Sequence, residues 1–161
     1  VVAQNSVDVH SREYGTKWNC ADGLQALDLT GGNEGIIYQD VPVTPGMVYS
    51  LSFHLSANLA GGSFVSFLAV YADGSLLDTV SFDSAGATFD TMNWQFHSFD
   101  ILAPDDVLRV TFQSLIPGNC GPAIDRVQLE MVEIPEPATA AAWTAVAVAG
   151  YAALRRKRGS A

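Results

Sequence analysis

Several predicted loops contain side chains that could bind a polar ligand. They are Trp18, Asn19, Asn33, Glu34 and Asn119. The face of an indole ring can stack on the apolar face of a sugar, while amide and carboxylate groups form directional hydrogen bonds. These residues are therefore candidates for a sugar-binding site. The favoured interpretation is that Trp18 is a loop tryptophan that closes one end of the core.

Catalytic residue patterns are poorly represented. The three histidines are His10, His54 and His97. Only His54 has a clear place in a strand pattern, and that pattern puts it on the polar face. The sequence contains no HExxH, GxSxG or phosphate-binding glycine loop, and no Cys/His cluster with metal-ligand spacing. We expect no enzyme activity, and a carboxylate pair acting on a glycan is the less favoured alternative.

The 161-residue chain divides into two parts of opposite charge. Residues 1–134 hold four basic residues against 16 acidic ones, a net charge of −12, whereas residues 135–161 have a net charge of +3. Hydrophobic residues make up 48 % of the chain and charged residues 16 %, which excludes a disordered acidic tail. The acidic body also argues against a nucleic-acid binder, because phosphate neutralisation needs clustered Lys and Arg.

The body is predicted to be all-β. Short apolar runs alternate with turn signals, and no window of residues 1–134 keeps a helical period. The alternation changes phase between Trp94 and Ile101, which predicts a bulge near His97–Ser98. This pattern favours an antiparallel jelly-roll sandwich. The expected strands are 6–10, 25–30, 35–43, 47–57, 64–72, 75–82, 94–102, 107–115 and 123–132.

A different kind of segment ends the chain. From Ala138 to Leu154, 17 residues carry no charge. As a helix they would span about 26 Å, slightly less than the roughly 30 Å hydrocarbon core of a bilayer. A run of cations would then hold the C-terminus on the cytoplasmic side. It consists of Arg155, Arg156, Lys157 and Arg158. We expect one short transmembrane helix over about 138–154, with a buried alanine-rich helix as the alternative.

Two prolines precede this segment, in the motif Pro135, Glu136 and Pro137. Prolines at this spacing interrupt helix and strand and hold the chain extended, so that a processing enzyme can grip it. The tripeptide, the apolar helix and the terminal Arg/Lys run, in that order, resemble the PEP-CTERM sorting signal of Gram-negative bacteria. The resemblance implies recognition by an exosortase and export to the cell surface or extracellular matrix, with at least transient anchoring in the inner membrane.

The body resembles the bacterial choice-of-anchor C domain, which is related to a domain group of plant cell-wall proteins. The matching stretches are Val7–Val9, Ala21–Leu29, Thr44–Gly46, Tyr49–Leu55 and Gly121–Asp125. The resemblance implies a galactose-binding-like β-sandwich over residues 1–133, followed by a sorting and anchor segment over 134–161. Members of that family open with a strand that has no counterpart here, so we expect an N-terminally truncated sequence that lacks its export signal.

The same resemblance makes three acidic residues candidates for holding a structural calcium ion. In many jelly-roll carbohydrate modules, an acidic residue at the start of the final strand helps to hold calcium, which prefers oxygen ligands from several loops. Asp125 stands at that place, and its phase with Val127 and Leu129 predicts that it points inward. Asp22 or Asp28 is the candidate for a further ligand. The alternative is that Asp125 caps backbone N–H groups in a tight turn.

Cys20 and Cys120 are the only cysteines, and both lie in predicted loops. An exported domain resides in an oxidising compartment, where such a pair is expected to form a disulfide. Two free buried thiols are the alternative.

Three hypotheses for function follow from these observations. The first is a noncatalytic exported protein that binds or organises extracellular polysaccharide, with the exosortase and the membrane as partners during sorting. The second is a structural matrix protein that self-associates without a sugar site. The third is a glycan-active enzyme on the same fold. No cofactor is expected apart from the candidate structural calcium ion.

Overall fold

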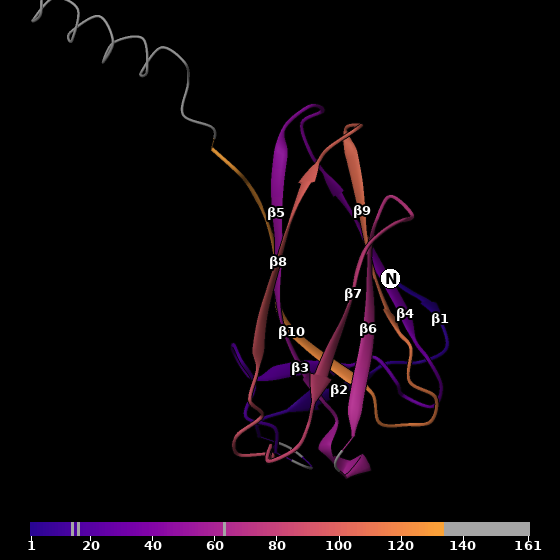
Figure 1. The fold of residues 1–161 in the computed structure, drawn as a ribbon, viewed down its shortest axis with the longest axis vertical. Coiled ribbons are helices and arrows are strands. Elements are labelled where there is room, and N and C mark those ends of the chain that lie inside the picture. Colours follow the sequence, from indigo (N-terminus) through magenta and orange to yellow (C-terminus); the bar gives the residue numbers. More distant parts are fainter. Residues whose placement is uncertain (14, 16, 63, 134–161) are drawn as a thin grey trace, which may run out of the picture.

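The computed structural model describes residues 1–13, 15, 17–62 and 64–133. They form two five-stranded antiparallel sheets that face each other as a sandwich (Figure 1). Sheet A has the strand order β1-β4-β9-β6-β7, and sheet B has the order β2-β3-β10-β5-β8. The prediction of an all-β antiparallel sandwich is confirmed.

The strands agree closely with those expected from the sequence. Those of sheet A are β1 (Val2–Gln4), β4 (Ile36–Pro42), β6 (Val65–Ala72), β7 (Ser75–Asp83) and β9 (Val107–Ser114). Those of sheet B are β2 (Asp8–Ser11), β3 (Gln25–Asp28), β5 (Val48–Ala57), β8 (Gln95–Leu102) and β10 (Pro122–Met131). A short 3₁₀ helix, η1 (Leu59–Gly61), follows β5. Strand β1 was not predicted, because all three of its residues are exposed and show no alternation.

The main core lies between the two sheets. In β5 the odd-numbered residues from Leu51 to Ala57 are fully buried in it, as the period of two along a strand requires. Phe53 joins the layers, because its ring stacks on His97 of β8 and stands edge-on against Phe112 of β9. The even-numbered residues of β5 therefore point to the outer face of sheet B.

The bulge predicted near His97–Ser98 is wrong. Strand β8 pairs with β5 in unbroken register along residues 95–102. Phe96 points to the outer face of sheet B, and 63 % of it is exposed. The apolar alternation changes phase in the sequence because Phe96, an aromatic residue, lies on the solvent side of the strand.

The bulge of this sheet lies in β10 instead, between Asp125 and Gln128. Arg126 adopts a left-handed φ of 50° there, which accommodates one extra residue. The extra residue shifts the alternation, so that Ile124 and Leu129 both contact the main core. Asp125 is paired with His54, an outer-face residue of β5. The expected inward orientation of Asp125 is therefore wrong.

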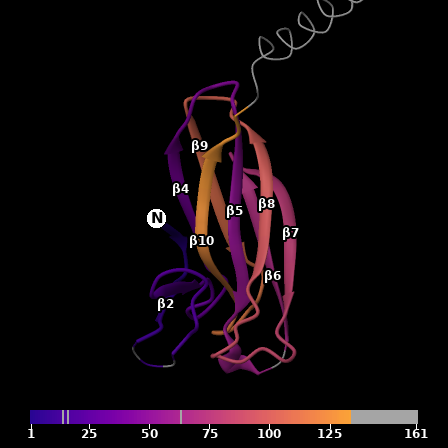
Figure 2. The ribbon, with the colours of Figure 1, turned by 90° about the vertical axis from the view of Figure 1, so that its left-hand side faces the viewer.

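A second, smaller core covers the outer face of sheet B at the end where β2 and β3 lie. Trp18, Cys20 and Met92 come from the β2–β3 and β7–β8 loops and pack on Ala26 of β3 and Ala123 of β10. Figure 2 shows these loops gathered at the lower end of the sandwich. This end of sheet B is thus covered by chain on both faces.

No helix within the described part of the chain is long and apolar enough to cross a membrane. The helix expected over 138–154, the motif at 135–137 and the cations at 155–158 lie outside the described residues.

Candidate functional site

Trp18 belongs to the second core and offers no face to a ligand. Its side chain is 1 % exposed. Its ring stacks on His10, with ring centroids 4.0 Å apart and planes 3° from parallel, and Phe89 lies 6.3 Å away. Trp18 therefore closes the end of the core, and its assignment as a sugar platform is corrected.

Asn19 is held within the same group of loops. Its backbone N–H donates to the carbonyl of Phe89 at 2.9 Å, and its Nδ2 donates to the carbonyl of Asp90 at 2.9 Å. Its Oδ1 accepts from Arg12 at 2.9 Å, and its carbonyl accepts from Nε1 of Trp94 at 2.8 Å. These bonds join the β2–β3 loop to the β7–β8 loop, so they give Asn19 a structural role.

The remaining loop candidates are not joined into one site. Asn33 and Asn119 are exposed, on the β3–β4 and β9–β10 loops. The carbonyl of Glu34 accepts from Nδ2 of Asn5 at 2.6 Å. Among the described residues, no side-chain hydrogen bond connects Asn33, Glu34 or Asn119 to Asn19 or Trp18.

Asp125 and Asp22 do meet, but as a turn rather than as a cation site. Oδ2 of Asp125 accepts from the Asp22 N–H at 3.0 Å, and Oδ1 accepts from the Arg126 N–H at 2.7 Å. Asp22 Oδ1 accepts from the Gly23 N–H at 2.9 Å. Within the described residues, no three His, Cys, Asp or Glu side chains converge as metal ligands. The described structure therefore does not bring the three candidate calcium ligands together, and calcium binding stays a prediction.

Asp28 lies in a separate, fully buried polar network. Its carboxylate accepts from the Thr30 N–H at 2.9 Å and from Nδ2 of Asn58 at 2.7 Å. The hydroxyl of Thr30 shares a 2.7 Å hydrogen bond with Ser114 of β9. Burial raises the pKa of Asp28 to about 6, although the hydrogen bond from Asn58 opposes the shift. Both oxygens are satisfied by protein donors, so Asp28 stabilises this end of the fold.

The disulfide expected between Cys20 and Cys120 is not formed in this structure, and both residues are free thiols. Cys20 is buried in the second core, where its Sγ donates to the carbonyl of Trp18 at 3.5 Å. Cys120 is half-buried, and its Sγ lies 3.7 Å from Oδ1 of Asn119. Burial raises the pKa of both thiols, which makes them poor nucleophiles.

The histidines form no catalytic arrangement with these groups. Burial lowers the pKa of His10, which stacks on Trp18, and of His97, which stacks on Phe53. His54 lies half-buried on the outer face of sheet B, with its ring edge-on to Phe96.

The outer face of sheet A carries several aromatic residues that remain wholly or partly exposed. We call it the aromatic face. It comprises Tyr38, Phe67, Tyr71, Arg109, Thr111 and Gln113. The register places Tyr38 of β4, Thr111 of β9 and Tyr71 of β6 in one row across the sheet. The two tyrosines are therefore about two strand spacings, roughly 10 Å, apart.

Strand β6 supplies two of the rings of the aromatic face. Phe67 and Tyr71 point to the same side of β6, and Phe67 is 42 % exposed. Ala69 lies between them and is 2 % exposed, so its larger neighbours close over its methyl group. The Tyr71 hydroxyl donates to Oε1 of Gln113 at 3.1 Å, which fixes the ring laterally. The result is a preformed platform of ring surface beside hydroxyl and amide groups.

An ion pair fixes one edge of the platform. The Arg109 guanidinium lies 4.0 Å from the centroid of the Tyr38 ring and donates to both carboxylate oxygens of Asp40, at 2.6 and 2.7 Å. Hydrogen bonding by Arg109 lowers the pKa of Asp40. The backbone N–H of Arg109, separately, donates to Oδ1 of Asp73 at 2.8 Å. The cation is therefore already paired, and it orients Tyr38 rather than attracting an anion.

The sequence of β6 contains two aromatic residues of this surface, but its pattern does not show that they face solvent. The segment 64–72 carries large apolar residues at both parities, which is typical of a strand buried on both faces. Leu68 and Val70 do face the core, whereas Phe67 and Tyr71 face solvent. Recognising them required the knowledge that β6 lies in a sheet whose second face is uncovered.

Comparisons with known proteins place the chain in a family and a fold. Residues 4–130 match the family described as "Protein of unknown function (DUF642)". The chain is also similar to Protein TEEBE of Arabidopsis thaliana, with 33 % identity over 115 residues that cover 68 % of this chain and 28 % of the relative. The chain thus corresponds to a little over a quarter of that relative's length.

Solved structures share the sandwich at low identity. A family 35 carbohydrate binding module from Clostridium thermocellum superposes with a TM-score of 0.54 and 17 % identity, covering 78 % of this chain and 98 % of that chain. TmCBM61, described in complex with β-1,4-galactotriose, gives a TM-score of 0.54 and 16 % identity over 82 % of this chain and 86 % of that chain. The likeness establishes the fold, and the family match identifies the chain as a member of the DUF642 family.

Proposed function

We propose that this domain is a noncatalytic binder of extracellular polysaccharide, and that the aromatic face of sheet A is its binding surface. The observation that carries the proposal is the row formed by Tyr38, Thr111 and Tyr71, together with the exposed ring of Phe67. A chain of sugar units can lie across such a row, stacking its apolar faces on the rings and bonding its hydroxyls to Thr111 and Gln113.

The fold supports the proposal. Structures described as carbohydrate-binding modules share this sandwich over most of their length. The aromatic face is preformed, because Gln113 holds Tyr71 and Arg109 holds Tyr38, so little side-chain entropy is lost on binding.

The charge of the domain supports a neutral ligand. Residues 1–134 carry a net charge of −12, and the one cation on the aromatic face is paired with Asp40. An acidic glycan would meet repulsion without compensation. We therefore expect neutral, extended polysaccharides to bind better than polyuronates at low ionic strength.

Affinity electrophoresis of the full chain tests this function. Gels would contain β-1,4-galactan, hydroxyethyl cellulose, polygalacturonate or the extracellular polysaccharide of the source organism. Retardation in at least one neutral polysaccharide supports the proposal. Migration unaltered in every gel would overturn it and favour the structural hypothesis, whereas release of soluble sugar would favour the enzymatic one.

Single substitutions then locate the site. Tyr71→Ala and Tyr38→Ala should weaken retardation by about tenfold each, as expected for losing one stacked ring. Phe96→Ala is the matched control, because Phe96 is an exposed aromatic residue on the opposite sheet. Loss of binding in Phe96→Ala alone would move the site to sheet B and leave the general function intact.

The route to the surface is a separate part of the proposal. We infer from the motif at 135–137, the apolar segment at 138–154 and the cations at 155–158 that an exosortase-type enzyme sorts the protein from the inner membrane to the cell surface or matrix. Mass spectrometry of surface material should detect no peptide beyond about Pro137. Peptides containing Arg155–Ala161 in that fraction would exclude processing and leave a plain membrane anchor.

A further inference from the structure

The sandwich is open along one side, between β10 of sheet B and β4 of sheet A. A cavity of about 660 Å³ lies there between the sheets. Its walls are almost entirely apolar and include Val2, Ile37, Val110, Val127 and Leu129. Val127 is 45 % exposed at its mouth. Figure 2 shows β10 and β4 bordering this side, with β2 below them.

The backbone of β10 is also open on this side. Strand β5 pairs with β10 along its whole length, apart from the bulge. On the opposite edge, β3 pairs only with Ala123 and Ile124. Within the described residues, the stretch from 125 to 131 therefore has no strand partner on that edge. Such an edge is a template for another strand.

The hydrogen-bonding pattern shows which groups are free. The Val132 N–H donates to the carbonyl of Val48 at 2.8 Å, so the even-numbered residues of this half of β10 bond to β5. In an antiparallel ladder, the residues between them direct N–H and C=O to the other side. Leu129 and Met131 therefore present these groups at the open edge.

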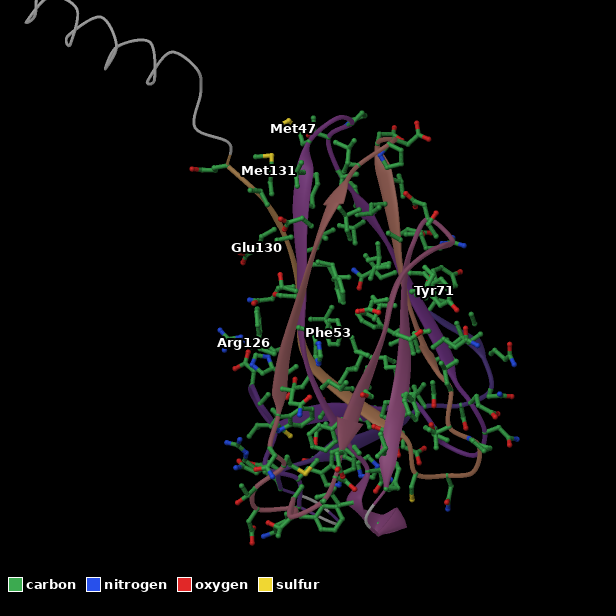
Figure 3. All side chains as sticks on the ribbon, in the orientation of Figure 1. Met47, Phe53, Tyr71, Arg126, Glu130 and Met131 are labelled. Carbon is green, nitrogen blue, oxygen red and sulfur yellow. The ribbon has the colours of Figure 1, made fainter. Side chains whose placement is uncertain are left out.

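The charges on β10 are arranged so that this edge complements itself. Arg126 and Glu130 flank Gln128, and both side chains are exposed. Figure 3 shows them on the same side of the molecule, pointing away from the sandwich. When two copies of β10 pair antiparallel about a two-fold axis at Gln128, Arg126 of each copy lies opposite Glu130 of the other. Val127 of each copy then lies opposite Leu129 of the other, and the two residues can form a backbone hydrogen-bonded pair.

Neighbouring registers with the same hydrogen-bonding phase are disfavoured. An axis at Arg126 would place two guanidinium groups opposite each other, and an axis at Glu130 would place two carboxylates opposite each other. Like charges directly across a strand pair are destabilising, whereas opposite charges stabilise it. An axis at Val127 or Leu129 also fits the hydrogen-bonding pattern, but it places Arg126 and Glu130 opposite uncharged residues. The register centred on Gln128 is therefore favoured because it pairs opposite charges.

We propose that two copies of this chain associate through the β10 edges, in the antiparallel register centred on Gln128, and form a continuous sheet across the dimer. The interface is isologous, as a two-fold dimer requires. Val127 and Leu129 of each copy close the mouth of the other's apolar cavity, which removes exposed apolar surface from water. The proposal does not rest on sugar binding.

Charge reversal tests the register. Sedimentation equilibrium of the 161-residue chain would compare the parent, Arg126→Glu, Glu130→Arg and the double variant. Each single reversal converts two attractive pairs into two repulsive ones, so the dimer dissociation constant should rise by roughly tenfold or more. The double variant restores both pairs and should return within about threefold of the parent.

Three outcomes would overturn the proposal. A parent that stays monomeric at all concentrations excludes the dimer. A dimer that is insensitive to both single reversals uses another surface, the C-terminal segment included. Hydrogen exchange supplies the third: the Leu129 amide should be protected in the dimer and exchange readily in the dissociated single variants. A Leu129 amide protected in a monomer would mean that another strand covers the edge.

Discussion

The two sheets carry similar polar-aromatic pairs on their outer faces, but these pairs have opposite environments. On sheet B, His10 stacks on Trp18 at a centroid distance of 4.0 Å and loops bury the pair. On sheet A, Arg109 lies 4.0 Å from the centroid of Tyr38 and remains half-exposed. A short stacking distance between a polar and an aromatic side chain therefore does not distinguish a covered core from an open surface. The presence of covering chain does.

The covering chain at sheet B is itself fixed by polar contacts. Asn19 holds the β2–β3 loop to the β7–β8 loop, and Ser56 donates to the carbonyl of Met92 at 2.6 Å. Amide and hydroxyl groups of the type that binds ligands form hydrogen bonds within the protein here. At sheet A, by contrast, Thr111 and Gln113 are partly exposed and lie in register with the half-exposed Tyr71 and the buried Ala69 of β6.

The largest expected effect comes from emptying the second core. Trp18→Ala should lower the free energy of unfolding by about 3–5 kcal/mol, because it leaves a cavity beside His10 and Met92. Urea unfolding followed by circular dichroism measures this loss. Tyr71→Ala is the matched control on the aromatic face, and it should cost about 1–2 kcal/mol, because it removes a half-buried ring and one hydrogen bond. Equal losses in the two variants would contradict the contrast between a covered and an uncovered face.

Asp28 should produce the next largest effect, and it depends on pH. Its pKa rises from a usual value near 3.8 to about 6 in the folded protein, because it is buried. The folded state therefore holds the proton more tightly, so the stability cost is absent below about pH 4, grows through pH 4–6 and is complete above pH 6. The free energy of unfolding should lose on the order of 2–3 kcal/mol over that range through this group.

Asp28→Asn isolates this contribution. The difference in unfolding free energy between the parent and the variant should change between pH 4 and pH 7, with the parent gaining relative stability at the acid end. Asp100→Asn, at an exposed position of β8, makes the same chemical change as a control. A parent-to-variant difference that stays constant with pH would show that Asp28 titrates normally and that the network is not closed to water.

The sequence predicted the strands well because a period of two is a local signal. It failed where a distant segment decides the outcome. Trp18 is buried by Phe89 and Met92, which lie in a loop some seventy residues further along the chain. No local sequence pattern in that loop predicts the contact. Asp125 was assigned the wrong face because one extra residue at Arg126 reverses the alternation. The aromatic face was missed because β6 is apolar at both parities.

A smaller effect is expected at Asp125, where sequence and structure suggested different roles. Asp125→Ala removes the acceptor for the Asp22 and Arg126 amides and should cost about 1 kcal/mol of stability. Calcium or EDTA should leave the melting temperature of the parent unchanged, since no three-ligand cluster forms in the described residues. Asp105→Ala, in an exposed loop, is the control. A calcium-dependent rise in melting temperature that Asp125→Ala abolishes would contradict this expectation and support a calcium site at Asp125.

The smallest effect separates ring stacking from hydrogen bonding on the aromatic face. Tyr71→Phe keeps the ring but removes the 3.1 Å hydrogen bond to Gln113, a change that should cost about 0.5–1 kcal/mol of stability. If the ring surface carries binding, this variant should retain most of its retardation in neutral polysaccharide gels, whereas Tyr71→Ala should not. Equal losses in both variants would mean that the fixed orientation of Tyr71, rather than its ring surface, determines affinity.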